Sequence, residues 1–265
     1  VTITDVNDQA PVWTTSATAS VAEGATAVAT MAATDSDTAD SGGLTYSITT
    51  DDPGAGTQFS VSGTALTIAA QDYETPACGS ASNSLTCVVV LAATDAGSTH
   101  STAHTITVTI TDTNDQAPVW TTSATANVAE GATAVATMAA TDTDTADANG
   151  LTYSITTNDP SGSVFAVSGT ALTMTAQDYE TPACGSGTNS LTCVVVLAAT
   201  DAGSTHSTAH TITVTITDTN DQAPVWTTPA TADVAEGATA VATMAATDSD
   251  TADSGGLTYS ITTND

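Results

Sequence analysis

The sequence predicts an all-β chain of tandem sandwich domains, on three observations. Asp5 recurs as Asp112 and Asp218, a period of about 107 residues, which corresponds to a whole domain and not to a solenoid unit of about 20–45 residues. Short stretches of alternating apolar and polar residues dominate each copy, and no long stretch has the period of an amphipathic helix. Gly, Pro and Asp residues flank these stretches, which is typical of the ends of β-strands.

Each expected strand follows from its pattern. In 105–111, Ile106, Val108 and Ile110 alternate with threonines, which indicates a strand with one buried face. The apolar stretch 85–93 indicates a more deeply buried strand, and the remaining stretches are shorter. The seven expected strands of the first copy are 20–23, 25–33, 44–48, 59–61, 65–68, 85–93 and 105–111. About seven short strands in about 100 residues are typical of a Greek-key sandwich of immunoglobulin type.

The domain boundaries are expected at the recurring segments 5–11, 112–118 and 218–224, each of which combines acids, an asparagine and a proline. Proline donates no ladder hydrogen bond, so such a segment is unsuited to a strand interior. We expect the end of a preceding repeat at 1–10, full repeats at 11–117 and 118–223, and the start of a further repeat at 224–265. The chain is therefore expected to be a segment of a longer array. Trp13, Trp120 and Trp226 are expected to fill the ends of the sandwiches.

The composition excludes several classes of partner. The chain has a formal net charge of -29 and no Lys or Arg. The chain therefore has no cationic Lys or Arg side chain to neutralise the phosphates of a nucleic acid or an anionic membrane surface. The longest apolar run, 88–93, is far shorter than the about 20 residues that a membrane-spanning helix needs. Because no cationic side chain balances the acids, bound cations or wide spacing must relieve their repulsion.

The acids recur in five motifs, in the same order in each full copy. In the first copy these are Glu23, Asp35-Ser36-Asp37, Asp72-Tyr73-Glu74, Asp95-Ala96-Gly97 and Asp112-Thr113-Asn114-Asp115. In the second copy they are Glu130, Asp142-Thr143-Asp144, Asp178-Tyr179-Glu180, Asp201-Ala202-Gly203 and Asp218-Thr219-Asn220-Asp221. With the proline and aromatic residue that follow the last motif, this arrangement resembles the cadherin repeat, over both full copies and the partial third.

The resemblance implies cadherin-type sandwiches joined by linkers that bind Ca²⁺, with up to three ions in each joint. Carried over by position, the first complete joint would use Glu23, Asp72, Glu74, Asp112, Asn114, Asp115, Asp142, Asp144 and Asp201. The second would use Glu130, Asp178, Glu180, Asp218, Asn220, Asp221, Asp248 and Asp250. The joint before residue 11 would use Asp5, Asn7, Asp8, Asp35, Asp37 and Asp95.

Physical chemistry independently favours a calcium site at these motifs. Calcium takes six to eight oxygen ligands at about 2.3–2.6 Å in irregular geometry. Aspartates at positions i and i+2 of an extended chain point the same way, roughly 7 Å apart. Of the ten acids in the span 112–217, eight belong to the motifs, a clustering that solvated turn acids would not show.

The cysteines predict local disulfides. Cys78 and Cys87, like Cys184 and Cys193, flank a short polar loop, and we expect each pair to form a disulfide that joins this loop to the following strand. A zinc site with His100 and His104 is the alternative. Residues four apart on a strand lie about 13 Å apart, too far to share one metal, so we expect these histidines to lie at the strand entrance.

Paired carboxylates also allow a glycosidase hypothesis. Every copy carries the same pairs, no insertion forms a pocket, and no Lys or Arg could bind an anionic substrate, so we expect no enzyme activity.

The functional hypothesis is a structural extracellular rod of calcium-rigidified repeats at the cell surface, as a self-assembling fibre or an adhesin stalk. Its expected partners are calcium and further copies of the repeat, and the composition suggests a microbial source. The alternative is an adhesive module that binds a protein or glycan through a sandwich face, which would require an exposed aromatic or apolar patch.

Overall fold

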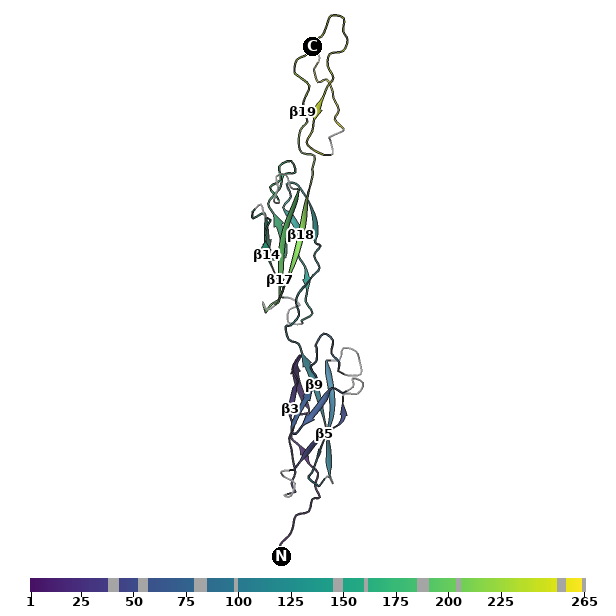
Figure 1. Cartoon of the computed structure of the whole chain (residues 1–265), viewed down its shortest axis with the longest axis vertical. Helices are drawn as coiled ribbons and strands as arrows, with labels where there is room; N and C mark the ends of the chain where they lie inside the picture. Colours follow the sequence, from purple (N-terminus) through teal and green to yellow (C-terminus); the bar gives the residue numbers. More distant parts are fainter. Residues whose placement is uncertain are drawn as a thin grey trace. The chain divides into compact units, whose positions relative to one another are not determined.

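The computed structural model divides into two compact units. It describes residues 1–37, 43–51, 57–78, 85–97, 100–144, 150–159, 162–184, 191–203, 206–251 and 256–263. Unit 1 comprises 1–115 with 143–146, and unit 2 comprises 116–142 with 147–265. The described residues contain strands and no helix, so the all-β prediction is confirmed (Figure 1).

The strands of unit 1 form two main sheets and a short pair. The strands are β1 (Val12–Trp13), β2 (Thr18–Ala22), β3 (Ala27–Thr30), β4 (Ala33–Thr34), β5 (Thr45–Asp51), β6 (Phe59–Ser62), β7 (Ala65–Ile68), β8 (Thr86–Thr94) and β9 (Ser101–Thr111). One sheet has the order β2-β9-β8-β5, the other β3-β7-β6, and β1 pairs with β4. Strand β2 runs parallel to β9, with Val21 opposite Ile110, and the other pairs are antiparallel. The predicted Greek-key sandwich is thus the observed architecture.

The expected strand 25–33 is divided in the structure. Strand β3 pairs with β7, whereas β4 pairs with β1, so the chain changes partner between them. Met31 lies at this change of partner, where its side chain is buried and its N–H donates to the Thr64 carbonyl at 2.7 Å. The N–H of Ala32 donates to the Thr15 hydroxyl at 2.7 Å. The split therefore reflects hydrogen bonding to two different strands, which the alternation of side chains alone does not encode.

The core follows the alternation of β8 and β9. Ile106, Val108 and Ile110 are buried on one face of β9, while the threonines between them are exposed or half-buried. In β8 the buried residues also alternate, so this strand has a half-buried outer face and is less deeply enclosed than the sequence suggests. Inward-facing side chains of both sheets thus form one core in unit 1.

Both predicted disulfides are present. Cys78 is bonded to Cys87 and Cys184 to Cys193, with 5.0 Å between the Cα atoms of each pair. All four side chains are buried in the cores of their repeats. The polar loops 79–84 and 185–190 lie outside the described residues.

The tryptophans are less buried than expected. Trp13 packs half-buried against the edge of the core, where its Nε1–H donates to the Thr102 carbonyl at 3.0 Å. Its ring stacks on His104 with 4.9 Å between centroids. The expectation for the histidines was correct for His100, which directly precedes β9. It was wrong for His104, which lies within β9 because the pairing with β8 begins at Ser101 and places His104 opposite Leu91.

Unit 2 repeats the topology of unit 1. Its strands are β10 (Val119–Trp120), β11 (Thr125–Ala129), β12 (Ala134–Thr137), β13 (Ala140–Thr141), β14 (Thr152–Thr157), β15 (Phe165–Ser168), β16 (Ala171–Met174), β17 (Thr192–Thr200) and β18 (Ser207–Thr217), with orders β11-β18-β17-β14 and β12-β16-β15. In the start of the third copy, β19 (Val225–Trp226) pairs with β20 (Ala246–Thr247). The sequence contains no third counterpart of β8 and β9, and Trp226 is 57% exposed. No helix long and apolar enough to span a membrane occurs among the described residues.

The core assignment predicts a specific loss of stability. Replacing Ile106, which is fully buried in β9, by Ala should lower the free energy of unfolding of its repeat by about 2–5 kcal/mol, since the change removes packed methyl groups and leaves a cavity. Urea denaturation would measure this loss. The matched control Thr105→Ala changes an exposed neighbour and should stay within about 0.5 kcal/mol of the parent protein. Equal losses in the two variants would contradict the assignment.

Candidate metal centre

Glu23 connects two segments that carry other acids. It directly follows β2, where its N–H donates to the Thr111 carbonyl at 3.0 Å, and it precedes Gly24, which adopts a positive φ of 71°. One carboxylate oxygen accepts the Tyr73 N–H at 2.8 Å and the other accepts the Thr113 N–H at 2.6 Å. These bonds hold Glu23 against the segment of Asp72 and Glu74.

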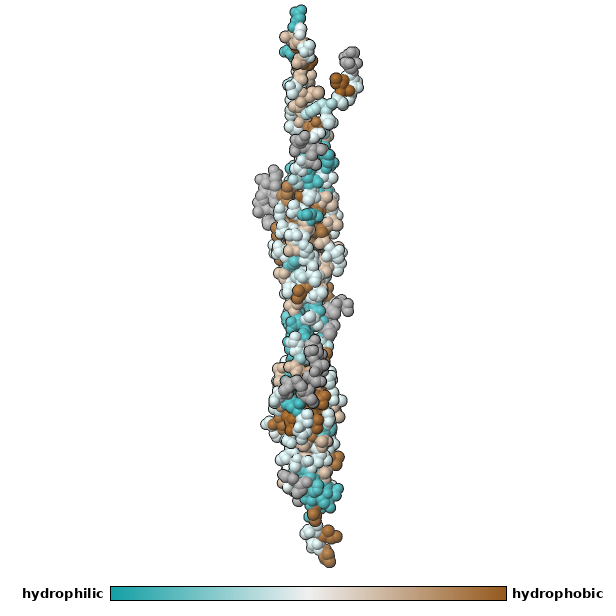
Figure 2. Space-filling view, turned by 90° about the vertical axis from the view of Figure 1, so that its right-hand side faces the viewer, coloured by the Kyte–Doolittle hydropathy of each residue, from teal (hydrophilic) through white to brown (hydrophobic). Residues whose placement is uncertain are grey.

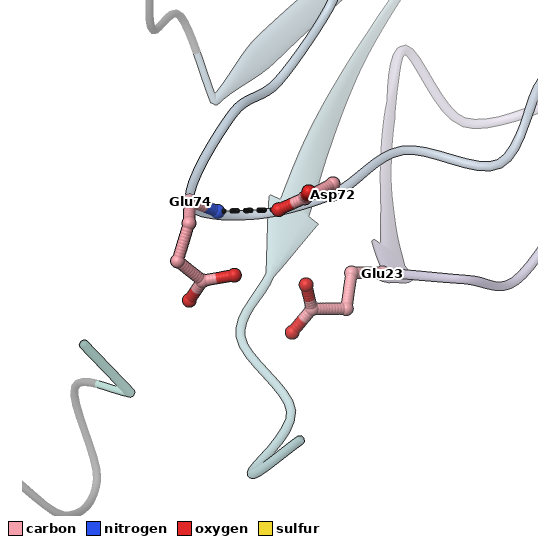
Figure 3. Close-up of side chains that lie close together, drawn as sticks. All are labelled: Glu23, Asp72 and Glu74. Atoms are coloured by element: carbon pink, nitrogen blue, oxygen red, sulfur yellow. Dashed lines mark hydrogen bonds between the residues drawn. The ribbon is translucent and has the colours of Figure 1, made fainter. Parts of the chain in front are cut away.

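Asp72 is held by a turn of its own. Its carboxylate accepts the N–H of Glu74 at 3.0 Å (Figure 3). It also accepts the N–H of Thr75 at 3.2 Å and the Thr75 hydroxyl at 2.8 Å. The bond from the Thr75 hydroxyl is the main reason why the pKa of Asp72 is lowered. Asp72 is therefore ionised at neutral pH.

The Glu74 carboxylate points into the space that it shares with Glu23 and Asp72 (Figure 3). One oxygen from each of these three residues lies within 4.8 Å of the others. Both Glu74 oxygens are buried and have no hydrogen-bond partner within the described part of the chain. Burial raises the pKa of the Glu74 carboxyl from 4.5 to about 7, and the charges of Glu23 and Asp144 add to the rise.

A second cluster in unit 1 also uses Glu74. Oxygens of Glu74, Asp112 and Asp144 lie within 4.8 Å of one another. Asp112 follows β9, and Asp144 is fully buried although it belongs to the predicted second repeat. Glu74 is thus shared by two groups of carboxylates.

Unit 2 also contains two clusters, of which the second corresponds position by position to the second cluster of unit 1. They comprise Glu130 with Glu180 and Asp221, and Glu180 with Asp218 and Asp250. Both oxygens of Glu180 are buried without a hydrogen-bond partner in the described residues. Burial, followed by the charge of Glu130, raises the pKa of Glu180. Burial also raises the pKa of Asp250, and the charges of Asp248 and Asp218 add to this effect.

Other predicted ligands of unit 1 are held by hydrogen bonds near its N-terminus. Asp37 accepts the N–H groups of Asp8 and Gln9 at 3.0 and 2.8 Å. The Nδ1 atom of His100 lies 3.2 Å from Asp95 Oδ2 and 3.2 Å from Asn7 Oδ1. The same contact joins His206 to Asp201. The sequence analysis predicted no contact between these two histidines and the acids. The available signal was that each histidine lies five residues after the aspartate of the fourth motif.

The clusters do not include every predicted ligand. Among the described residues, the predicted acidic ligands outside the four clusters are Asp5, Asp8, Asp35, Asp37, Asp95, Asp115, Asp142, Asp178, Asp201 and Asp248. The clusters are defined by acidic side chains, so they do not test the predicted asparagine ligands Asn7, Asn114 and Asn220. Asp178 nevertheless repeats the turn of Asp72, because it accepts the Glu180 N–H at 3.0 Å and the Thr181 hydroxyl at 2.8 Å. The ligand roles of these residues stay predictions.

The clusters have the chemistry of a hard-cation site. Their potential ligands are carboxylate oxygens, without nitrogen or sulfur. Such ligands suit Ca²⁺, Mg²⁺ or Mn²⁺. A buried carboxylate without a hydrogen-bond donor is unfavourable unless it is protonated or meets a cation. The four clusters could therefore hold ions.

Comparisons with known proteins identify the fold. No protein-family model and no curated protein match the chain. Among solved structures, mouse cadherin-23 EC22-24 is 22% identical, with a TM-score of 0.62, and the match covers 92% of this chain and 79% of that one. The extracellular domain of protocadherin GammaB4 is 22% identical (TM-score 0.56; 80% of this chain, 35% of that one), and the human desmocollin-1 ectodomain is 19% identical (0.60; 84% and 44%). The chain thus spans about a third of the protocadherin structure, and the cadherin-like fold is confirmed.

The raised pKa of Glu74 predicts how stability depends on pH when no metal is bound. The folded protein holds this proton more tightly than the unfolded chain, because the pKa is about 7 in place of 4.5. The resulting stabilisation is present below pH 4.5 and is lost as the pH rises through 7. Metal-stripped protein should therefore melt at a higher temperature at pH 5 than at pH 8 in circular-dichroism experiments.

The variant Glu74→Gln provides the control, since an amide does not titrate in this range. Its melting temperature should differ less between pH 5 and pH 8 than that of the parent protein. An equal difference in the two proteins would show that the pH dependence arises from other acids.

Proposed function

We propose that this chain is a structural, non-catalytic segment of an extracellular surface protein, in which Ca²⁺ bound at the carboxylate clusters stiffens successive cadherin-like repeats. The main support for the proposal is the environment of the Glu74 and Glu180 carboxylates. Each places two buried oxygens among other carboxylates, without a hydrogen-bond donor in the described residues, in a chain that has no Lys or Arg. A cation is the partner that this arrangement lacks.

Calcium fits these residues better than other common ions do. Zinc is usually bound by His and Cys, and the clusters contain neither. Magnesium requires near-ideal octahedral geometry and retains several waters, whereas calcium accepts many carboxylates in irregular arrangements. The residues that would hold it are Glu23, Asp72, Glu74, Asp112 and Asp144 in unit 1, and Glu130, Glu180, Asp218, Asp221 and Asp250 in unit 2.

Bound calcium would join successive repeats as well as neutralise charge. In unit 2, Glu180 and Asp218 belong to the predicted second repeat and Asp250 to the start of the third, yet their oxygens lie within 4.8 Å. An ion held by all three would replace mutual repulsion with attraction to one positive centre. This linkage is the physical basis for the proposed stiffness.

Two observations support an extracellular location. The two disulfides are typical of an oxidising compartment. Two of the similar solved structures are described as an extracellular domain and an ectodomain. A net charge of -29 would keep such a surface segment soluble and apart from its neighbours. Assembly into a fibre and a microbial source remain predictions from the sequence.

The alternative of an adhesive recognition module has less support. Such a module would present an exposed aromatic or apolar patch. Among the described residues of the two full repeats, the large hydrophobic side chains that are well exposed are Val12, Val119 and Val194. On the face that Figure 2 presents, apolar residues are interspersed with pale and polar ones. This distribution favours a spacer.

A calcium titration of the variant Asp144→Ala tests the proposal. Asp144 is fully buried in the cluster with Glu74 and Asp112, so its removal should weaken binding at that cluster by about tenfold or more and leave the sandwich folded. Isothermal titration calorimetry would measure binding, and circular dichroism would follow the β signal. Calcium should also raise the melting temperature of the parent protein, because a ligand that binds only the folded state stabilises it.

The matched control is Asp233→Asn, which neutralises an exposed acid outside the motifs. It should bind calcium as the parent protein does. Two results would refute the proposal: a parent chain that binds no calcium at millimolar concentrations, or an Asp144→Ala variant that binds with unchanged affinity and stoichiometry.

A further inference from the structure

The segment that carries Asp72 and Glu74 belongs to no strand. It lies between β7, which ends at Ile68, and the disulfide at Cys78. Ladder hydrogen bonds therefore do not fix its position. Within the segment, Asp72 bonds to its own turn, and Glu23, itself a proposed ligand, accepts the Tyr73 N–H. Other residues are needed to hold these ligands in place before a cation arrives.

Gln71 holds the beginning of this segment. It is 5% exposed and directly precedes Asp72. Its side-chain Nε2 donates to the Ala69 carbonyl at 2.9 Å, and its Oε1 accepts the Ala77 N–H at 3.0 Å. Its main-chain carbonyl accepts the N–H of Gly24 at 2.9 Å, beside Glu23. Gln71 thus connects both ends of the segment and the turn that carries Glu23.

The disulfide holds the end of the segment. Cys78 lies four residues after Glu74 and is bonded to Cys87 in β8, a central strand of the four-stranded sheet. Both cysteines are buried, and Cys78 Sγ lies 3.3 Å from Gln71 Oε1. The glutamine and the disulfide therefore meet behind the ligand segment and join it to the sheet.

The second repeat retains this arrangement and varies one contact. Gln177 is equally buried, its Oε1 accepts the Ala183 N–H at 3.1 Å, and its Nε2 donates to the Thr175 carbonyl at 2.9 Å. In the first repeat Nε2 also donates to Gln58, whereas in the second it donates to the Thr175 hydroxyl. The two contacts that are retained are those that close the segment, together with the Cys184–Cys193 disulfide.

We propose that Gln71 with the Cys78–Cys87 disulfide, and Gln177 with the Cys184–Cys193 disulfide, are positioning groups that preorganise the Asp-Tyr-Glu segments for cation binding. This inference rests on the proposed calcium function. Groups behind the ligands of a metal typically change its affinity by about 10–100-fold when they are removed. A disulfide that served only to staple the fold would change the stability of the repeat without selectively lowering the affinity of one cluster.

The test compares Cys78→Ala/Cys87→Ala and Gln71→Met with the parent chain. In metal-free protein, hydrogen exchange should show that the amides of Tyr73, Glu74 and Thr75 lose protection, while those of β8 and β9 keep it. In the same variants, calorimetry with calcium chloride should show about 10–100-fold weaker binding at one group of sites. The double variant Cys184→Ala/Cys193→Ala is the matched control and should produce both effects in the second repeat only. The two segments are identical from residue 71 to 78 and 177 to 184, so the peptides followed should include Ala69 or Thr175, which differ.

The possible results distinguish the positioning role from the proposed calcium function. If the parent chain binds calcium and the variants bind it equally well, the positioning role is wrong and the proposed function stands. If the parent chain binds no calcium, both are wrong. If the cysteine variant loses protection throughout β8 and β9, the disulfide is a general staple and its positioning role is refuted. Gln71→Met, which keeps the disulfide, then tests the glutamine by itself.

Discussion

Repulsion among carboxylates that no cationic side chain can balance is the constraint on which this structure depends. The chain has 29 acids and neither Lys nor Arg, so salt bridges to such residues cannot offset the repulsion. The fold nevertheless gathers acids in close groups, and it buries Asp144 and Asp250 completely. Gathering like charges is unfavourable in the absence of a counterion. The arrangement of these acidic groups is therefore suited to binding a cation.

The sandwich supplies the positions of these acids. Glu23 follows β2 and Asp112 follows β9, two neighbouring strands that run parallel, so both acids emerge at the same end of the sheet. The Asp72–Glu74 segment reaches that end from the other sheet, after β7, and the Glu23 carboxylate bonds to its backbone. Because the copies share their sequence pattern, unit 2 repeats the group of Glu74, Asp112 and Asp144 as Glu180, Asp218 and Asp250, while its other group contains Asp221 in place of Asp178.

Much of this was predictable from the sequence, and the remainder depends on tertiary contacts. The alternation of Ile106, Val108 and Ile110 identified β9 and its buried face. The division at Met31 was not predictable, because it depends on which strands accept the hydrogen bonds on either side. The stacking of His104 on Trp13 depends on the proximity of β1 and β9, which are distant in sequence. For the site, the motifs identified the acidic residues. They could not show that both Glu74 oxygens are buried without a hydrogen-bond donor in the described residues, because this depends on the three-dimensional positions of the neighbouring groups.

The most direct test of the central claim is anomalous X-ray diffraction from crystals of the chain grown with calcium. The account predicts anomalous peaks among the oxygens of Glu23, Asp72 and Glu74, among those of Glu74, Asp112 and Asp144, and in the corresponding groups of unit 2. A well-resolved map that shows these carboxylates turned toward solvent, with no peak between them, would contradict it.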